Sequence, residues 1–180
     1  TIRFMLDNLT PQLLAGQVIS LIGLALCIAG FSSKRDDRLL VLLIGANIAF
    51  AIHFVLFSSW TAAALTLLII VRIALARAFY GSWTAMTIML VLSAIAAALT
   101  WQGPIDIFPV IAAVLGTVGM FILRGIPMRI VLAGAALAWT LNNILIGSIG
   151  GTLTEGIIFV TNLITIGRLI RAKRRGLLPS

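Results

Sequence analysis

The polar and charged side chains that interrupt apolar stretches are the residues whose chemistry could bind a solute. Arg72 stands inside "LTLLIIVRIALARAF", residues 65–79, and Asn162 stands in another apolar stretch about 90 positions later. A guanidinium recognises carboxylate or phosphate groups through its planar fork of donors. Charged and amide side chains are costly inside a membrane and mark by default a pathway, a site or a helix contact. We expect Arg72 to face the interior of a helix bundle, with Asn162 among its candidate partners; snorkelling or simple helix packing is the competing interpretation.

A second group of polar residues is predicted nearer the opposite ends of the helices. With two aromatic residues, it consists of Phe50, His53, Trp139, Asn142, Asn143 and Glu155. Phe50 and His53 are three residues apart, as are Trp139 and Asn142, so each pair shares one helix face. The group predicts a vestibule wall for a polar solute. The alternative is that the amides hydrogen-bond neighbouring helices and that His53 lies near headgroup water.

These residues must be positioned by membrane-spanning helices. The chain has 180 residues, of which 61% are hydrophobic and 10% charged, whereas roughly a quarter of the residues in a soluble domain are charged. Charged residues, Gly, Pro and Ser divide it into seven apolar segments of membrane-spanning length. They are residues 11–31, 39–57, 60–80, 83–101, 105–123, 128–147 and 152–171. We therefore predict an all-α membrane protein of seven helices, forming a single domain over residues 1–180.

The basic residues predict how these helices cross the membrane. One set of loops and helix ends carries Lys34, Arg35, Arg38, Arg77, Arg124, Arg129, Arg168, Arg171, Lys173, Arg174 and Arg175. The opposite loops, "FSSW", "QGPID" and "GSIGGT", contain neither Lys nor Arg, and only Arg3 offsets the bias. The positive-inside rule then puts the N-terminus outside and the C-terminus in the cytoplasm. Trp60, Tyr80, Trp83 and Trp101 fall at predicted helix ends, as interfacial aromatic residues do.

Several classes of function are disfavoured by the same residues. The formal charge of +8 is concentrated at span ends, which is unlike a nucleic-acid-binding face, so we expect the bilayer and not nucleic acid as partner. Cys27 is the single cysteine and lies in an apolar run, where it is expected to be a buried hydrophobe. One histidine, with no metalloprotease motif, aspartate pair or phosphate-binding loop, leaves no catalytic constellation. We expect no enzyme, no metal and no cofactor, and homo-oligomerisation stays open.

Two parts of the chain look like copies of one three-helix unit. Residues 11–80 would form the first copy, 83–101 a linker helix and 105–172 the second copy. At an offset near 90, Arg38 pairs with Arg129, Phe50 with Trp139, His53 with Asn142, Ser59 with Ser148 and Arg77 with Arg168. A linker helix lets both copies face the same way, giving a parallel 3+1+3 repeat with a solute site where the copies meet.

The stretches "FSSKRDDRLLVLL", "HFVLFSSWTAAALTLLIIVRIALARAF" and "MRIVLAGAALAWTLNNILIGSIGGTLTEGIIFVTNLITIGRLI" resemble YgjV-type bacterial inner-membrane proteins over nearly the whole chain. More distantly, the 3+1+3 plan resembles the SWEET, PQ-loop and nicotinamide-riboside transporter group. That resemblance implies a central site formed by Arg72 and Asn162, with Phe50, His53, Trp139 and Asn142. Arg72 stands where a sugar carrier would have an amide, which disfavours a neutral sugar. An alternative register matches Thr66 and Arg72 with Asn162 and Arg168.

Taken together, these features predict a small-solute transporter of the bacterial inner membrane. It would be a facilitator or exchanger that works by alternating access on a polar or anionic metabolite. The alternative is a non-transporting assembly partner or sensor whose basic tail, "RLIRAKRRG", docks a cytoplasmic protein or anionic lipid.

Overall fold

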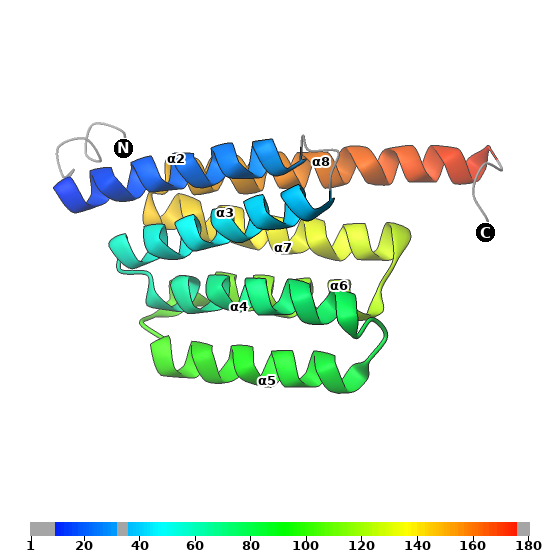
Figure 1. Cartoon of the computed structure of the whole chain (residues 1–180), viewed down its shortest axis with the longest axis horizontal. Coiled ribbons are helices and arrows are strands. Elements are labelled where there is room, and N and C mark those ends of the chain that lie inside the picture. Colours follow the sequence, from blue (N-terminus) through cyan, green and yellow to red (C-terminus); the bar gives the residue numbers. More distant parts are fainter. Residues whose placement is uncertain (1–9, 32–35, 176–180) are drawn as a thin grey trace.

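The computed structural model describes residues 10–31 and 36–175, and its regular secondary structure there is helical. Seven α-helices follow one another, and a short 3-10 helix precedes the fifth of them. They are α2 (Pro11–Phe31), α3 (Asp36–Leu56), α4 (Trp60–Ala78), α5 (Trp83–Thr100), η1 (Pro104–Asp106), α6 (Ile107–Ile122), α7 (Gly125–Ile146) and α8 (Ile149–Arg174). Figure 1 shows them running back and forth along one direction, with α8 extending past the other helices toward the C-terminus.

Six of these helices are long and apolar enough to cross a membrane. The remaining helix, α3, contributes the apolar stretch Val41–Leu56. Large apolar side chains cover the outside of the bundle, as Leu99 does with an exposed fraction of 81%. Such a surface suits lipid better than water. The prediction of an all-helical protein with multiple membrane spans is confirmed.

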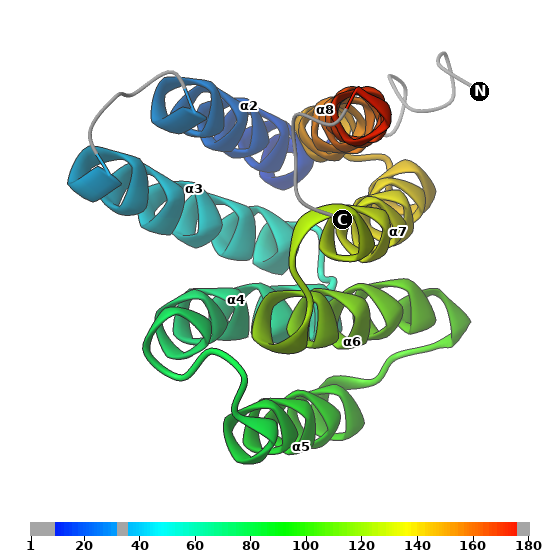
Figure 2. The ribbon, with the colours of Figure 1, turned by 90° about the vertical axis from the view of Figure 1, so that its right-hand side faces the viewer.

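Six helices form a ring and the seventh lies outside it. Going round the ring, α2 packs on α3, α3 on α4, α4 on α6, α6 on α7, α7 on α8, and α8 back on α2. α5 lies on the outer side of this ring, where it packs against α4 and α6 (Figure 2). Residues that face inward from the six helices of this ring can therefore meet at its centre.

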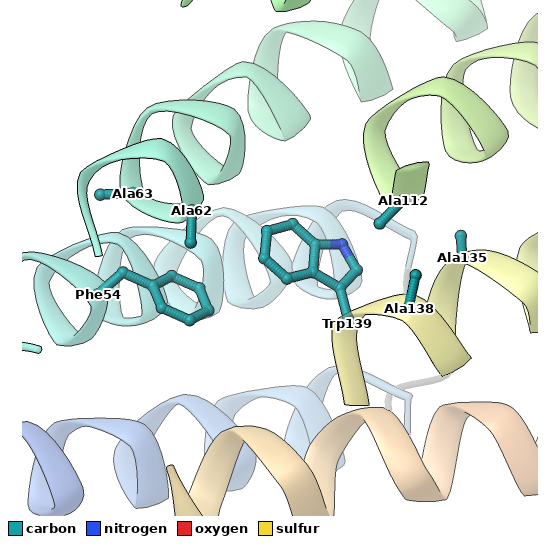
Figure 3. Close-up of a cluster of buried hydrophobic side chains, with 7 residues drawn as sticks. All are labelled: Phe54, Ala62, Ala63, Ala112, Ala135, Ala138 and Trp139. Carbon is teal, nitrogen blue, oxygen red and sulfur yellow. The ribbon is translucent and has the colours of Figure 1, made fainter. Parts of the chain in front are cut away.

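Small side chains let the helices of the ring approach one another closely. A cluster of buried residues joins α3, α4, α6 and α7; its members are Phe54, Ala62, Ala63, Ala112, Ala135, Ala138 and Trp139 (Figure 3). Phe54 and Trp139 stack with their ring centroids 5.5 Å apart. In lipid, where apolar burial between helices gains little, contacts between small residues and well-packed rings hold the helices together. This cluster fixes the position of the two aromatic rings at the centre.

The α3–α4 and α7–α8 turns have the same backbone geometry. Ser58 and Gly147, which are 89 positions apart, both have positive φ values, 55° and 79°. The amides of residues 58 and 147 donate to the carbonyl three positions back, and those of residues 59 and 148 to the carbonyl five positions back. The helices that follow begin at corresponding residues, Trp60 and Ile149. We call the end of the bundle that carries these turns the turn end.

Two glutamines hold the first amides after these turns, and we call them the glutamine clamps. The Oε1 atom of Gln17 on α2 accepts a hydrogen bond from the Ile149 amide at 3.0 Å, and its Nε2 atom donates to the Gly147 carbonyl at 2.7 Å. Gln102, just before η1, accepts a hydrogen bond from the Trp60 amide at 3.0 Å. Each clamp satisfies an amide that has no partner within its own helix.

The helix ends differ slightly from the predicted bounds. α7 begins at Gly125 instead of residue 128, and α8 begins at Ile149 instead of residue 152. α8 begins early because the Ser148 side chain accepts a hydrogen bond from the Gly151 amide, which caps the helix. The predicted basic residues Arg3, Lys34 and Arg35 lie outside the described residues.

Candidate functional site

A small cavity lies at the centre of the ring. Its volume is about 30 Å³, which is room for roughly one or two water molecules. The lining comes from α3, α4, α7 and α8, and consists of Asn47, Phe50, Phe54, Thr66, Ile69, Trp139, Asn143, Gly151 and Glu155. Four residues that we singled out from the sequence are therefore brought together here, namely Phe50, Trp139, Asn143 and Glu155.

Aromatic rings form one part of the cavity wall. The ring of Phe50 lies over Gly23 of α2, where an added Cβ atom would come within 2.9 Å of the ring carbons. Phe54 and Trp139 contribute the stacked pair that belongs to the buried cluster. The absence of a side chain at Gly23 thus allows Phe50 to pack closely beside the cavity.

Three polar side chains of the lining each donate a hydrogen bond away from the cavity, to a carbonyl of their own helix. Asn47 Nδ2 donates to the Leu43 carbonyl at 2.8 Å. Thr66 Oγ1 donates to the Ala62 carbonyl at 2.7 Å, and Asn143 Nδ2 donates to the Trp139 carbonyl at 2.9 Å. In all three cases the acceptor is the carbonyl four residues earlier in the same helix. The oxygen atoms of these side chains remain as acceptors.

Asn143 and Glu155 complete this oxygen-rich lining. Asn143 is 1% exposed, and its Oδ1 atom has no hydrogen-bond partner among the described residues. This atom lies where a Cβ atom on Gly151 would be, so Gly151 makes room for it. Glu155 is one turn further along α8 and brings a carboxylate to the same cavity.

Arg72 faces protein instead of lipid, but it lies outside the cavity lining. Its side chain is 8% exposed and its Nη1 atom donates to the Ala113 carbonyl of α6 at 3.3 Å. The guanidinium lies directly on Gly116, where an added Cβ atom would be 2.6 Å from Nη1. Its Nε atom has no partner among the described residues. The side chain is thus enclosed between α4 and α6.

Asn162, predicted to lie beside Arg72, has different partners. Its Oδ1 atom accepts a hydrogen bond from Arg129 of α7 at 3.3 Å, and its Nδ2 atom donates to the Ile158 carbonyl of its own helix. Arg72 and Asn162 are therefore engaged with different helices and neither is part of the cavity lining.

His53 and Asn142 are fully buried beside the cavity lining but are not members of it. His53 Nδ1 lies 2.9 Å from the Gly16 carbonyl of α2, and because a carbonyl only accepts, this nitrogen carries the proton. Its ring packs on Phe54 and Phe57, with centroids 5.0 and 4.4 Å away. Both amide atoms of Asn142 and the Nε2 atom of His53 have no partner among the described residues.

Five residues of the cavity lining were not predicted as site residues from the sequence: Asn47, Phe54, Thr66, Ile69 and Gly151. The spacing of Asn47, Phe50 and Phe54 by three and four residues would have placed them on one helix face. Phe54 and Thr66 also stand 89 positions before Asn143 and Glu155. Applying the offset of 89 residues to Asn143 and Glu155 would therefore have identified Phe54 and Thr66.

An all-helical ring with an apolar outside and a polar centre defines a multi-pass membrane protein, and comparison with known proteins specifies it further. The model of a family described as bacterial inner membrane protein, Imp-YgjV, matches residues 14–173. The chain belongs to this family. It is 28% identical over 163 residues to the inner membrane protein YgjV of Escherichia coli (strain K12), covering 91% of this chain and 88% of that protein. No solved structure matches the chain. The expected family and the location in the bacterial inner membrane are confirmed.

Proposed function

We propose that this protein is a small-solute carrier that works by alternating access, with the central cavity as its solute site. The moving units would be residues 11–80 and 105–172, with the helix at 83–101 as linker. The observation that carries this proposal is that corresponding positions of both units line one central cavity. Phe50 and Trp139 are 89 positions apart, and so are Phe54 and Asn143, and Thr66 and Glu155.

Three further observations support two related units. The α3–α4 and α7–α8 turns share φ signs and hydrogen bonds at the same offset of 89. The helix contacts between the two units are also equivalent. If α2 corresponds to α6 and α4 to α8, the contact of α2 with α8 corresponds to the contact of α6 with α4. The glutamine clamps join the two units in both directions: Gln17 of the first unit holds the start of α8, and Gln102, in the loop just ahead of the second unit, holds the start of α4. These features favour the parallel 3+1+3 arrangement, similar to that of SWEET-like carriers, over the register shifted by six residues.

Alternating access can be tested without knowing the solute. Thr66→Cys, in a Cys27→Ser background, puts a thiol into the cavity. The carrier proposal expects a membrane-impermeant thiol reagent to modify this residue both in right-side-out vesicles and in inverted vesicles, because the cavity opens to each side in turn. Ser93→Cys is the matched control: Ser93 is also buried and bonded to a carbonyl four residues earlier, but it lies on α5, outside the ring.

The same experiment separates the carrier from the second candidate, a non-transporting assembly partner or sensor. This candidate is favoured by the small volume of the cavity and by the packing of Arg72 on α6 instead of in the cavity. It expects Thr66→Cys to remain unmodified from both sides. Modification from one side alone describes a fixed vestibule and would also contradict alternating access.

A further inference from the structure

We propose that the central cavity binds a small cation through its oxygen acceptors, with Glu155 as the opposing charge. This inference deepens the proposed function by assigning the chemical class of the ligand, and it rests on that function only in treating the cavity as the solute site. A cation takes the place of the anionic solute that we expected from the sequence, because the Arg72 guanidinium lies outside the cavity lining.

The first argument is the direction of the hydrogen bonds in the lining. Asn47, Thr66 and Asn143 each donate a hydrogen bond to a carbonyl of their own helix. Their oxygens remain, and the Oδ1 atom of Asn143 is buried without a partner. A buried acceptor without a partner is unfavourable until a donor or a cation reaches it. The lining is thus complementary to a ligand that donates hydrogen bonds or coordinates oxygen.

The second argument is charge. Among the described residues, Glu155 is the one charged member of the cavity lining, and a carboxylate in the interior of a membrane bundle needs an opposite charge. The guanidinium of Arg72 donates to the Ala113 carbonyl and lies on Gly116, outside the lining. An anion entering the cavity would meet the Glu155 carboxylate and the unpaired Oδ1 atom of Asn143, whereas both of these would attract a cation. The Arg72 guanidinium also attracts Glu155, but from outside the lining.

The aromatic residues and the size of the cavity agree with this assignment. Phe50, Phe54 and Trp139 bring aromatic rings to the wall, and the faces of such rings attract cations, Trp most strongly. A volume of about 30 Å³ accommodates an ion of the size of a water molecule, such as ammonium or an alkali ion, in the closed state. Oxygen ligands suit both kinds of ion.

Thermal unfolding of the purified full-length chain in detergent tests the proposal. We would compare chloride salts of ammonium, methylammonium, sodium and potassium with tetramethylammonium chloride at equal concentration, because tetramethylammonium is too large for the cavity. At least one small cation is expected to raise Tm by roughly 3 °C or more with saturation, since a ligand that binds only the folded state stabilises it. The most effective salt distinguishes an amine from an alkali ion.

Two variants locate the effect in the cavity. Glu155→Gln keeps the shape but removes the charge, and should abolish the difference between the small cation and tetramethylammonium. Thr66→Val removes one acceptor and should shift the half-saturating salt concentration upward by about fivefold or more. Thr117→Val is the matched control for the second variant, because Thr117 is buried and bonded to the Ala113 carbonyl but lies on α6, outside the lining.

The proposal is overturned if Tm is the same in all the chloride salts, or if the stabilisation persists in Glu155→Gln. It is equally overturned if sodium phosphate or sodium acetate stabilises the protein where the chlorides do not. Should Glu155→Gln fail to fold, Thr66→Val against Thr117→Val decides the question. Saturable cation binding together with an inaccessible Thr66→Cys would leave the cation site standing and refute the carrier. Modification of Thr66→Cys from both sides, with no effect of cations on Tm, would support the carrier and refute the cation site.

Discussion

Arg72 and Glu155 bring opposite charges into the bundle, yet their surroundings differ. Glu155 lines a cavity, whereas Arg72 is enclosed between two helices. Among the described residues, Arg72 has one hydrogen bond, of 3.3 Å to a neutral carbonyl, and an electrostatic attraction to Glu155 that is smaller than the cost of its burial. Removing a charge from water costs several kcal/mol, while one hydrogen bond to a charged group contributes about 1.5–3 kcal/mol. The balance suggests that Arg72 is not retained for stability.

We therefore predict that Arg72→Met leaves Tm unchanged or raises it. Methionine is flexible enough to fill the space over Gly116 without a buried charge. Thermal unfolding in detergent measures the effect, and Arg77→Met serves as the control because Arg77 is exposed on the same helix. A fall of more than about 5 °C, specific to Arg72→Met, would mean that the guanidinium is a structural contact that the fold needs.

Which polar side chains reach the cavity was the least predictable feature of this chain. Hydropathy identified which residues are polar and deep, but not how each helix is rotated about its axis. Asn142 and Asn143 are neighbours about 100° apart on one helix, and only Asn143 reaches the cavity. Arg72 was expected to face the interior and does face protein, but packing on Gly116 directs it toward α6. Such choices depend on contacts between helices, which no single segment encodes.

Helix packing depends on close approach at a few glycines. Gly150, at the start of α8, lies against the backbone of α2, where an added Cβ atom would be 2.6 Å from the Ser20 carbonyl carbon and 2.8 Å from the Leu21 amide nitrogen. Backbone atoms cannot move aside as a flexible side chain can. The contact between α2 and α8, which closes the ring, therefore requires glycine at this position.

Gly150→Ala is predicted to destabilise the protein by about 1–3 kcal/mol, because α8 must move away from α2. Gly156→Ala is the matched control on the same helix, since an added Cβ atom there meets nothing within 4 Å. It should be neutral or stabilising by up to about 1 kcal/mol, as alanine favours the helix. Chemical or thermal unfolding compares the two; equal effects would show that the approach at Gly150 is not constraining.

The number and order of the helices follow from the sequence because each apolar segment is long and separated from the next by charged or turn-forming residues. The helix starts were less predictable, because they depend on local capping. Ser148 caps α8 and extends it by three residues beyond the prediction. Closure of the ring was not predictable from any one segment.

At the scale of the whole molecule, the distribution of basic residues makes the two ends of the bundle unlike. The turn end carries the glutamine clamps, while α8 ends in Arg171, Lys173 and Arg174 at the opposite end (Figure 1). Cytoplasmic loops of membrane proteins are enriched in Lys and Arg, so the proposed orientation has the turn end outside and the C-terminus in the cytoplasm.

This orientation predicts the labelling of two single-cysteine variants made in the Cys27→Ser background. Ile105→Cys, at the turn end, should react with an impermeant maleimide added to intact spheroplasts. Lys173→Cys should react only after the membrane is permeabilised, because its residue would face the cytoplasm. Both residues are exposed in the structure, so access to reagent is not limited by packing. The opposite pattern of labelling would reverse the orientation.

The glutamine clamps also bear on whether half of this chain could stand alone. Gln17 serves the start of α8, and Gln102 serves the start of α4. A fragment ending after α4 would leave the amide of Trp60 without its acceptor, and the complementary fragment would lack the acceptor for Ile149. Each fragment holds the missing hydrogen-bonding group of the other. Co-expressed pieces should consequently reassemble, whereas either piece by itself would have an incompletely bonded turn and an open, polar-lined flank facing lipid.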